Sequence, residues 1–97
     1  MYQNIHFQGV LDFINDLSHE DQGKIRLAFD AIERGYFNAV HVKNVRSPVK
    51  ELIVRQYRIL FVIKSKEIYF LTMFIKKTRK TPVQEIDRAF KILKLLK

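Results

Sequence analysis

The sequence predicts an α+β fold, with an N-terminal helical hairpin packed on a small antiparallel meander sheet and a C-terminal helix. Three observations support this prediction. Apolar residues recur at helical spacing up to residue 35, β-branched and aromatic residues dominate residues 50–75, and a helix start marked by proline follows. The 97 residues, 47% of them hydrophobic, are enough for one core, so we expect a single domain over residues 1–97.

The predicted hairpin consists of two short helices joined by a tight turn. The apolar stripe of the first, between residues 8 and 17, comprises Val10, Phe13, Ile14 and Leu17. The stripe of the second comprises Ile25, Ala28, Phe29 and Ile32. Ser18 is a suitable N-cap for the second helix, and Gly35 can end it in a left-handed conformation.

Strands are predicted in the second half of the chain, at residues 51–54, 57–63 and 68–75. The run 57–63 is apolar on both faces. Tyr57, Ile59, Phe61 and Ile63 alternate with Leu60 and Val62. This pattern predicts a central strand that is covered on both sides. Before these strands we expect only a short strand around 39–42, and then a break at Pro48.

The C-terminal helix has a clear predicted start. Thr81 is expected to be its N-cap, Pro82 its first residue, and Gln84 the partner that completes a capping box. Its apolar stripe comprises Ile86, Phe90 and Leu93, while basic residues occupy much of the remaining surface.

Charge is divided unevenly along the chain. Residues 1–42 contain three basic and six acidic residues, a net of −3, whereas residues 43–97 contain fifteen basic and four acidic residues, a net of +11. The alternative reading is an ordinary surface of solvated lysines. So large an asymmetry favours a partner that is a polyanion.

Several classes of function are excluded by composition. The absence of cysteine removes disulfides, thiolate metal sites and cysteine nucleophiles, and the three histidines are scattered. No glycine-rich phosphate loop is present, and the basic half lacks a carboxylate cluster. Any enzymatic mechanism is therefore expected to need no metal and no cofactor. Without a membrane-spanning run or an export signal, we expect a cytoplasmic protein that does not contact the membrane.

The candidate site is a set of cations on the predicted strands and the loops beside them, namely Lys43, Lys50, Arg55, Arg58, Lys76, Lys77, Arg79 and Lys80. Arg58 lies within an apolar strand, where a guanidinium must face solvent, a partner or a ligand. The alternative is an arginine paired with Glu51 or Glu67. The loop 76–80 is either a phosphate clamp beside the helix start or simply a solvated loop.

Aromatic residues near these cations have two readings. Tyr57, Tyr69 and Phe74 could stack on nucleic-acid bases, or they could belong to the core of the sheet.

One long block has a family resemblance. Residues 74–89 resemble the F-x-K-K-T-x-K-T-P-x-x-E-I-x-x-A block of phage-derived RelE/HigB-like toxins. Residues 49–52 and 57–61 are similar to the "ELR" and "YR-(I/V)-(hydrophobic)-(aromatic)" strands of that family. The likeness covers roughly residues 7–95, and the C-terminal block is its most specific part.

The resemblance implies a type II toxin–antitoxin system. The toxin would be a metal-free endoribonuclease that cleaves translated mRNA on the ribosome, and a helix-turn-helix, HigA-like antitoxin would hold it in check. In that chemistry the ribose 2′-OH attacks the adjacent phosphodiester, cations stabilise the phosphorane, and a lysine, histidine or tyrosine assists proton transfer. The resemblance makes Arg58, Lys76, Lys77 and Lys43 the candidate catalytic residues.

The chain departs from the family pattern in two places. The arginine of "ELR" is Ile53 here, and no histidine follows His41. We expect Arg55 to project on the same side as Ile53 and to replace the missing arginine, with Lys50, Arg79 and Lys80 also binding RNA. A solvent-facing Arg55 is the alternative. Two other functions remain open, a ParE-like inhibitor of gyrase and a non-catalytic basic module that binds nucleic acid.

Overall fold

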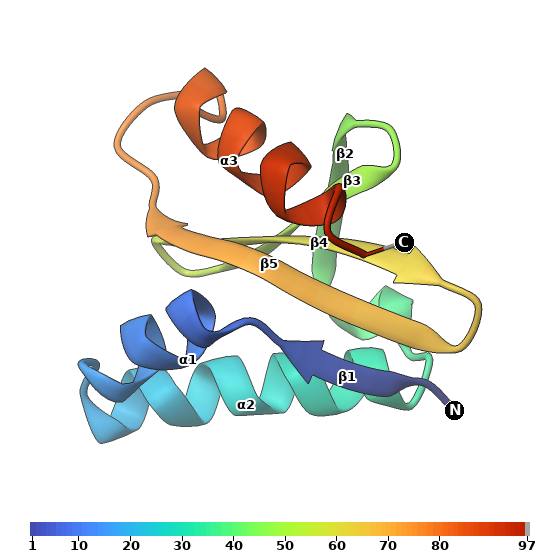
Figure 1. Cartoon of the computed structure of the whole chain (residues 1–97). Coiled ribbons are helices and arrows are strands. Elements are labelled where there is room, and N and C mark those ends of the chain that lie inside the picture. The colour runs from blue at the N-terminus through green and yellow to red at the C-terminus, as the bar shows by residue number, and fades with distance from the viewer. Residues whose placement is uncertain (97) are drawn as a thin grey trace.

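The computed structural model describes residues 1–96 and has helices on both faces of one five-stranded sheet (Figure 1). The elements are β1 (Gln3–His6), α1 (Gln8–Asn15), α2 (His19–Glu33), the 3₁₀ turn η1 (Phe37–Ala39), β2 (His41–Arg46), β3 (Val49–Val54), β4 (Tyr57–Lys64), β5 (Glu67–Ile75) and α3 (Val83–Leu93). The strand order is β1-β5-β4-β3-β2. The predicted α+β class is confirmed. None of the helices in the described part of the chain is long and apolar enough to cross a membrane.

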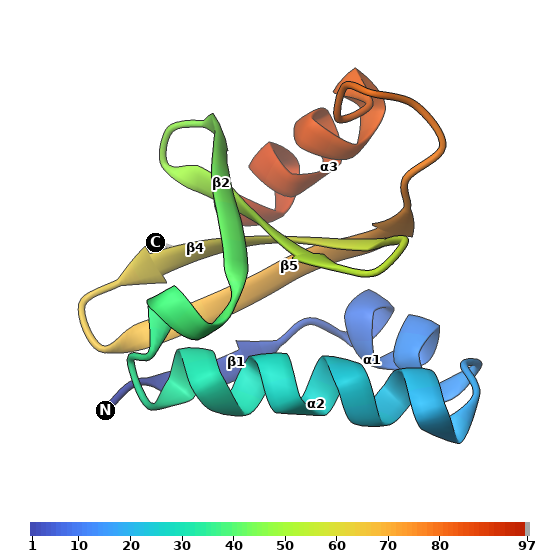
Figure 2. The ribbon, with the colours of Figure 1, turned by 180° about the vertical axis from the view of Figure 1, so that it is seen from behind.

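The helical hairpin has the predicted signals at its turn and its end. The Ser18 side chain accepts a hydrogen bond from the Asp21 backbone N–H at 3.2 Å, so Ser18 is the N-cap of α2. Gly35 has a φ of +82°, a left-handed conformation that glycine adopts without a steric penalty, and it follows the end of α2. α1 and α2 together cover one face of the sheet (Figure 2).

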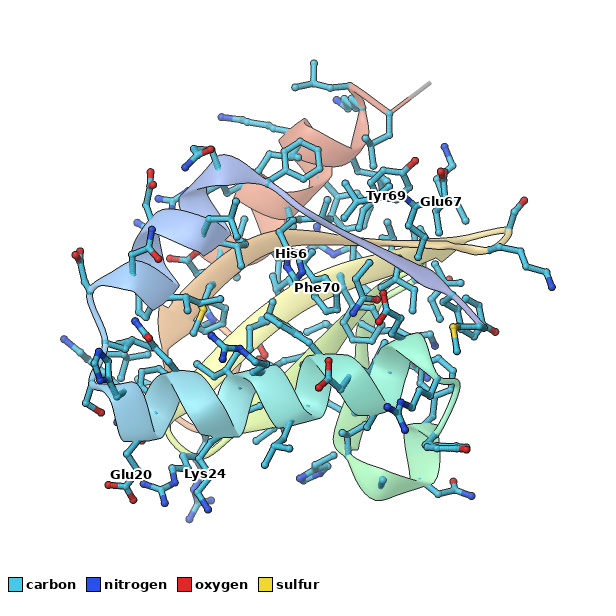
Figure 3. The ribbon with its side chains drawn as sticks, turned by 90° about the horizontal axis from the view of Figure 1, so that it is seen from below. His6, Glu20, Lys24, Glu67, Tyr69 and Phe70 are labelled. Atoms are coloured by element: carbon cyan, nitrogen blue, oxygen red, sulfur yellow. The ribbon has the colours of Figure 1, made fainter. Side chains whose placement is uncertain are left out.

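The first strand was not predicted, and it changes the sheet from a pure meander to a mixed sheet. β1 pairs in parallel with β5, with Gln3 opposite Glu67 and His6 opposite Phe70, whereas the other neighbouring strands are antiparallel. Two polar residues of β1, Asn4 and His6, lie inward. The Asn4 side chain donates to the Phe29 carbonyl at 3.0 Å, and the His6 ring stacks on Phe70 (Figure 3). Four residues, three of them polar, carry no strand periodicity, so only the pairing partner identifies this strand.

The segment before residue 50 is more regular than predicted. The 3₁₀ turn η1 overlaps the expected short strand around 39–42 only at Ala39, and the strand itself, β2, begins at His41 and continues beyond the prediction to Arg46. Pro48 lies in the turn that joins β2 to β3, as its place in the sequence predicted.

The central strand β4 separates two apolar cores, as predicted. Toward α1 and α2 it contributes Tyr57, Ile59 and Phe61; toward α3 it contributes Leu60 and Val62. The alternation of side chains along β4 therefore decides which residues share a face with α3.

α3 begins differently from the prediction. Pro82, rather than Thr81, is the N-cap, and no side chain caps the helix. The Thr81 hydroxyl instead donates to Glu51 at 3.0 Å, and Gln84 is exposed. A hydrogen bond from a hydroxyl to a buried carboxylate is stronger than the bond between a capping hydroxyl and a helix N–H. This difference accounts for the use of Thr81 as a partner of Glu51. The predicted capping box is therefore wrong.

The β2–β3 hairpin rises beside α3 (Figures 1 and 2). Arg46 connects the two, because its guanidinium lies 3.6 Å from the Asp87 carboxylate and 5.5 Å from the centre of the Phe90 ring. The α3 face of the sheet is thus enclosed by α3 and by this hairpin.

Candidate functional site

Three cations and one carboxylate occupy the α3 face, at the end of the sheet where β5 leads into the loop 76–82 (Figure 1). Lys43 lies opposite Glu51 in the β2–β3 register, and Glu51 lies opposite Leu60 of the α3-facing core. Arg58, two residues before Leu60, shares its face. Lys76 follows Phe74 by two residues and joins the same face just beyond β5. We call Lys43, Glu51, Arg58 and Lys76 the basic cluster.

Glu51 is at the centre of the basic cluster and is fully buried. One carboxylate oxygen, Oε2, accepts the hydrogen bond from Thr81 Oγ1, and the other, Oε1, lies 3.3 Å from Lys43 Nζ. Oε1 makes no well-aligned hydrogen bond among the described residues. A buried carboxylate is costly without such partners, so these two contacts account for its place in the sheet.

Arg58 is half-buried and has no carboxylate partner among residues 1–96. Its Nη1 donates to the carbonyls of Arg55 and Tyr57 at 2.7 and 2.9 Å, while its Nε is buried without a hydrogen bond. The alternative that Arg58 pairs with Glu51 or Glu67 is therefore wrong. The guanidinium keeps its full positive charge for an external anion.

Glu67 is far from this site. Its carboxylate accepts a hydrogen bond from the Tyr69 hydroxyl at 2.6 Å, at the other end of β5 (Figure 3).

The pKa of Lys76 lies below the ordinary value of a lysine. Burial lowers the pKa of Lys76, and contact with the Lys43 side chain lowers it further. The charge of Arg58 acts in the same direction, whereas the nearby Glu51 carboxylate opposes the shift. An amine whose pKa lies below its usual value can serve as a base nearer to neutral pH.

The tyrosines of the sheet are unsuited to proton transfer or to stacking on bases. The hydrogen bond to Asp21 raises the pKa of Tyr57, and that to Glu67 raises the pKa of Tyr69. Tyr57 and Phe74 are buried in the two cores. Of the two readings of the aromatic residues, the structure favours the core.

The remaining cations of the KKT-x-K segment lie on the loop that overhangs this end of the sheet. Lys77, Arg79 and Lys80 are exposed, and within the loop Thr78 Oγ1 donates to the Lys80 carbonyl at 2.9 Å. The loop thus adds three exposed positive charges beside the basic cluster.

Lys50 does not join this group. Its ammonium donates to Asn44 Oδ1 at 2.8 Å. Lys50 is two residues before Leu52 on β3, so it lies on the same face of the sheet as Leu52, the face toward α1 and α2.

Arg55 also lies on the opposite side, which overturns its expected placement beside Ile53. β3 ends at Val54, and Arg55 is in the two-residue turn to β4 with a φ of +55°. Its guanidinium contacts Glu20 at 3.4 Å and Asp21 at 3.5 Å, both on α2. The alternation of a strand does not continue through a tight turn, and for this reason the extrapolation from Ile53 fails.

Two residues of the site were not identified from the sequence. From the sequence, Glu51 is a possible partner of Arg58 and Thr81 a possible helix cap, and neither is predicted to belong to the site. A single carboxylate in the otherwise apolar run 51–54 was the available signal, because such a residue must find partners in the fold. The described residues hold no group of three His, Cys, Asp or Glu side chains that could bind a metal ion.

Comparison with known proteins identifies the family of this chain. No curated protein matches the chain. The family model described as phage-derived protein Gp49-like matches residues 12–94, which include every member of the basic cluster and the whole loop 76–82. The chain therefore belongs to the phage-derived Gp49-like family, which is part of the RelE/ParE-like toxin superfamily.

Proposed function

We propose that this protein is the toxin of a type II toxin–antitoxin pair and cleaves translated mRNA on the ribosome without a metal ion. The observation that carries the proposal is the basic cluster, in which three cations surround a single carboxylate and Arg58 has no ion-pair partner among residues 1–96. Such an excess of positive charge at one end of a sheet suits a phosphate group.

The chemistry assigns a role to each of the three cations of the basic cluster. The neutral amine of Lys76 accepts the proton of the ribose 2′-OH, and the 2′-oxygen forms a bond to the adjacent phosphorus. Arg58 and Lys43 stabilise the additional negative charge of the phosphorane. The bond from phosphorus to the 5′-oxygen then breaks, and that oxygen leaves with a proton from water. The products are a 2′,3′-cyclic phosphate and a 5′-hydroxyl.

The exposed cations of the loop supply binding rather than chemistry. Lys77, Arg79 and Lys80 are free to contact the phosphates on either side of the cleaved bond. Lys50 and Arg55 face α1 and α2, so we do not assign them to this site.

We attribute dependence on the ribosome to the small number of groups that the site offers for proton transfer. Its base is one lysine of lowered pKa, with no carboxylate base and no histidine in the cluster. A single base is most effective where the 2′-OH and the phosphate are held in line, which the ribosome can do for mRNA in its decoding site.

The toxin also needs a partner that neutralises it. We propose a helix-turn-helix antitoxin with an acidic contact surface, because the chain carries a net charge of +8. Association of the two should then slow as the salt concentration rises.

A map of transcript ends after brief induction tests the proposed function. Primer extension is expected to find new 5′ ends within translated reading frames, and none in cells that express Arg58→Ala. Intact transcripts together with relaxed plasmids and a loss of gyrase supercoiling would instead support a ParE-like inhibitor. Intact transcripts with normal supercoiling would support a non-catalytic binding module.

A further inference from the structure

Glu51 connects two parts of the basic cluster that are distant in the sequence. Its carboxylate contacts Lys43 on β2 and Thr81, the residue before the N-cap of α3. Both contacts are made inside the protein, because no part of Glu51 is exposed and Thr81 is also buried. A buried carboxylate with two partners restricts both of them, since leaving its charge unpaired would be costly.

Two hydrogen bonds attach the loop 76–82 to the sheet. The loop is attached to the sheet at its start, where the Lys76 N–H donates to the Gln56 carbonyl at 2.9 Å. At its other end it is attached by the hydrogen bond from Thr81 to Glu51. The residues between these two attachments are exposed and make the single internal hydrogen bond described above.

Glu51 also acts on the charge of the site. Each of three strands presents one charged group to Lys76, namely Lys43 on β2, Glu51 on β3 and Arg58 on β4. Glu51 is the only negative group of the three. The Glu51 carboxylate therefore contacts Lys43 directly and acts on Lys76 through its charge.

We propose that Glu51 is a positioning residue of the phosphate site, which holds Lys43 with one carboxylate oxygen and the loop 76–82, through Thr81, with the other. The inference rests on the proposed function, since it assigns Glu51 to the machinery of the same site. Glu51 does not touch the RNA. It sets the place of Lys43 and of the loop, and the balance of charge around Lys76.

Two substitutions separate these roles. Glu51→Gln keeps an oxygen that can accept from Thr81 but removes the negative charge. Thr81→Val keeps the charge and the shape but removes the hydroxyl, and Thr81→Ser restores it. Glu67→Gln is the matched control, because Glu67 is a hydrogen-bonded carboxylate at the other end of β5.

The first measurement needs no ribosome. The pKa of Lys76 is followed through the NMR shift of its ε-carbon in the isolated protein and its variants. Glu51→Gln should lower it, because the carboxylate opposes the downward shift, whereas Lys43→Gln should raise it. Glu67→Gln and Thr81→Val should leave it unchanged.

The second measurement is single-turnover cleavage of mRNA on programmed ribosomes. Thr81→Val should reduce the rate on the order of a hundredfold, as expected for a displaced contact. Thr81→Ser should recover most of the rate. Thermal midpoints show that the variants compared are folded.

Either of two results would overturn the inference, namely an unchanged Lys76 pKa in folded Glu51→Gln, or full activity in Thr81→Val. If Glu51→Gln does not fold, the Thr81→Val and Thr81→Ser pair decides the question. If the wild-type protein cleaves no mRNA, the proposed function fails, while the titration of Lys76 still shows whether Glu51 sets the charge of the site.

Discussion

Tyr57 and Arg58 are neighbours on β4 that point to opposite faces of the sheet and belong to different parts of the molecule. The Tyr57 hydroxyl donates a hydrogen bond to Asp21 on α2, within the structural core. The Arg58 guanidinium lies on the α3 face with the basic cluster. Substitutions at these two positions should consequently have different effects, the first on folding and the second on function.

Arg58→Ala is expected to abolish toxicity and to leave the fold intact. Loss of one donor to the transition state is worth about 3 kcal/mol, or roughly a hundredfold in rate. The measurement compares growth arrest with the thermal midpoint for the same variant. Tyr57→Phe is the neighbouring control and should lower the midpoint while it retains toxicity. A large fall in the midpoint of Arg58→Ala would mean that the arginine is structural.

The rate of cleavage should rise with pH and level off below the usual pKa of a lysine. Lys76 must be neutral to accept a proton, and its pKa is lowered by burial and by Lys43. Single-turnover rates on ribosome complexes, measured across the range in which ribosomes remain intact, would show the rising limb. Lys76→Arg should remove the activity at every pH, because arginine stays protonated. A rate independent of pH would contradict the role given to Lys76.

Cleavage is expected to need translating ribosomes and no divalent ion beyond those that the ribosome requires. The described residues contain no cluster of carboxylates or histidines for a metal. Naked RNA should be a poor substrate, with or without magnesium. Efficient magnesium-dependent cutting of naked RNA by the purified protein would rule out this mechanism.

Arg55 is expected to matter for stability and not for toxicity. Its ion pairs with Glu20 and Asp21 are partly exposed, so Arg55→Ala should cost only about 0.2–1 kcal/mol of unfolding free energy for each pair. Arg55→Gly should be more stable than Arg55→Ala by about 1 kcal/mol, because Arg55 has a positive φ that glycine adopts freely. Urea unfolding of both variants checks this order. Loss of toxicity in a folded Arg55→Ala variant would instead indicate that Arg55 contributes to RNA binding.

His6 should make the protein less stable in mild acid. Burial lowers the pKa of His6 below 6.5, and the charge of Glu33 offsets only part of that shift. The unfolded chain then binds more protons than the folded one as the pH falls through 6.5, so this contribution to stability is lost below that pH. Unfolding free energies at about pH 5 and about pH 7.5 would show the effect. His6→Phe, which keeps a ring against Phe70, should have a smaller difference between the two.

The features that sequence predicted correctly are local ones. The alternation along β4, the Ser18 cap and the left-handed Gly35 each depend on neighbouring residues. The features that it missed depend on partners far along the chain. β1 exists because β5 pairs with it, and Thr81 leaves the helix cap because Glu51, thirty positions earlier, lies within reach.

The residues of the site likewise differ in how far their positions can be predicted from neighbouring residues. Strand alternation places Arg58 and Lys76, both candidates from the sequence, on one face. The position of Arg55 depended on where β3 turns, and one residue of difference moved the guanidinium to the other side of the sheet.

The parallel pairing of β1 with β5 has a consequence for synthesis of the protein. β1 leaves the ribosome before its partner β5, which begins at Glu67, has been made. Thr81 and Glu51 are likewise joined only once the end of the basic loop has emerged. A nascent chain therefore has neither the β1–β5 pairing nor the ordered cation site until the residues up to Thr81 have emerged from the ribosome.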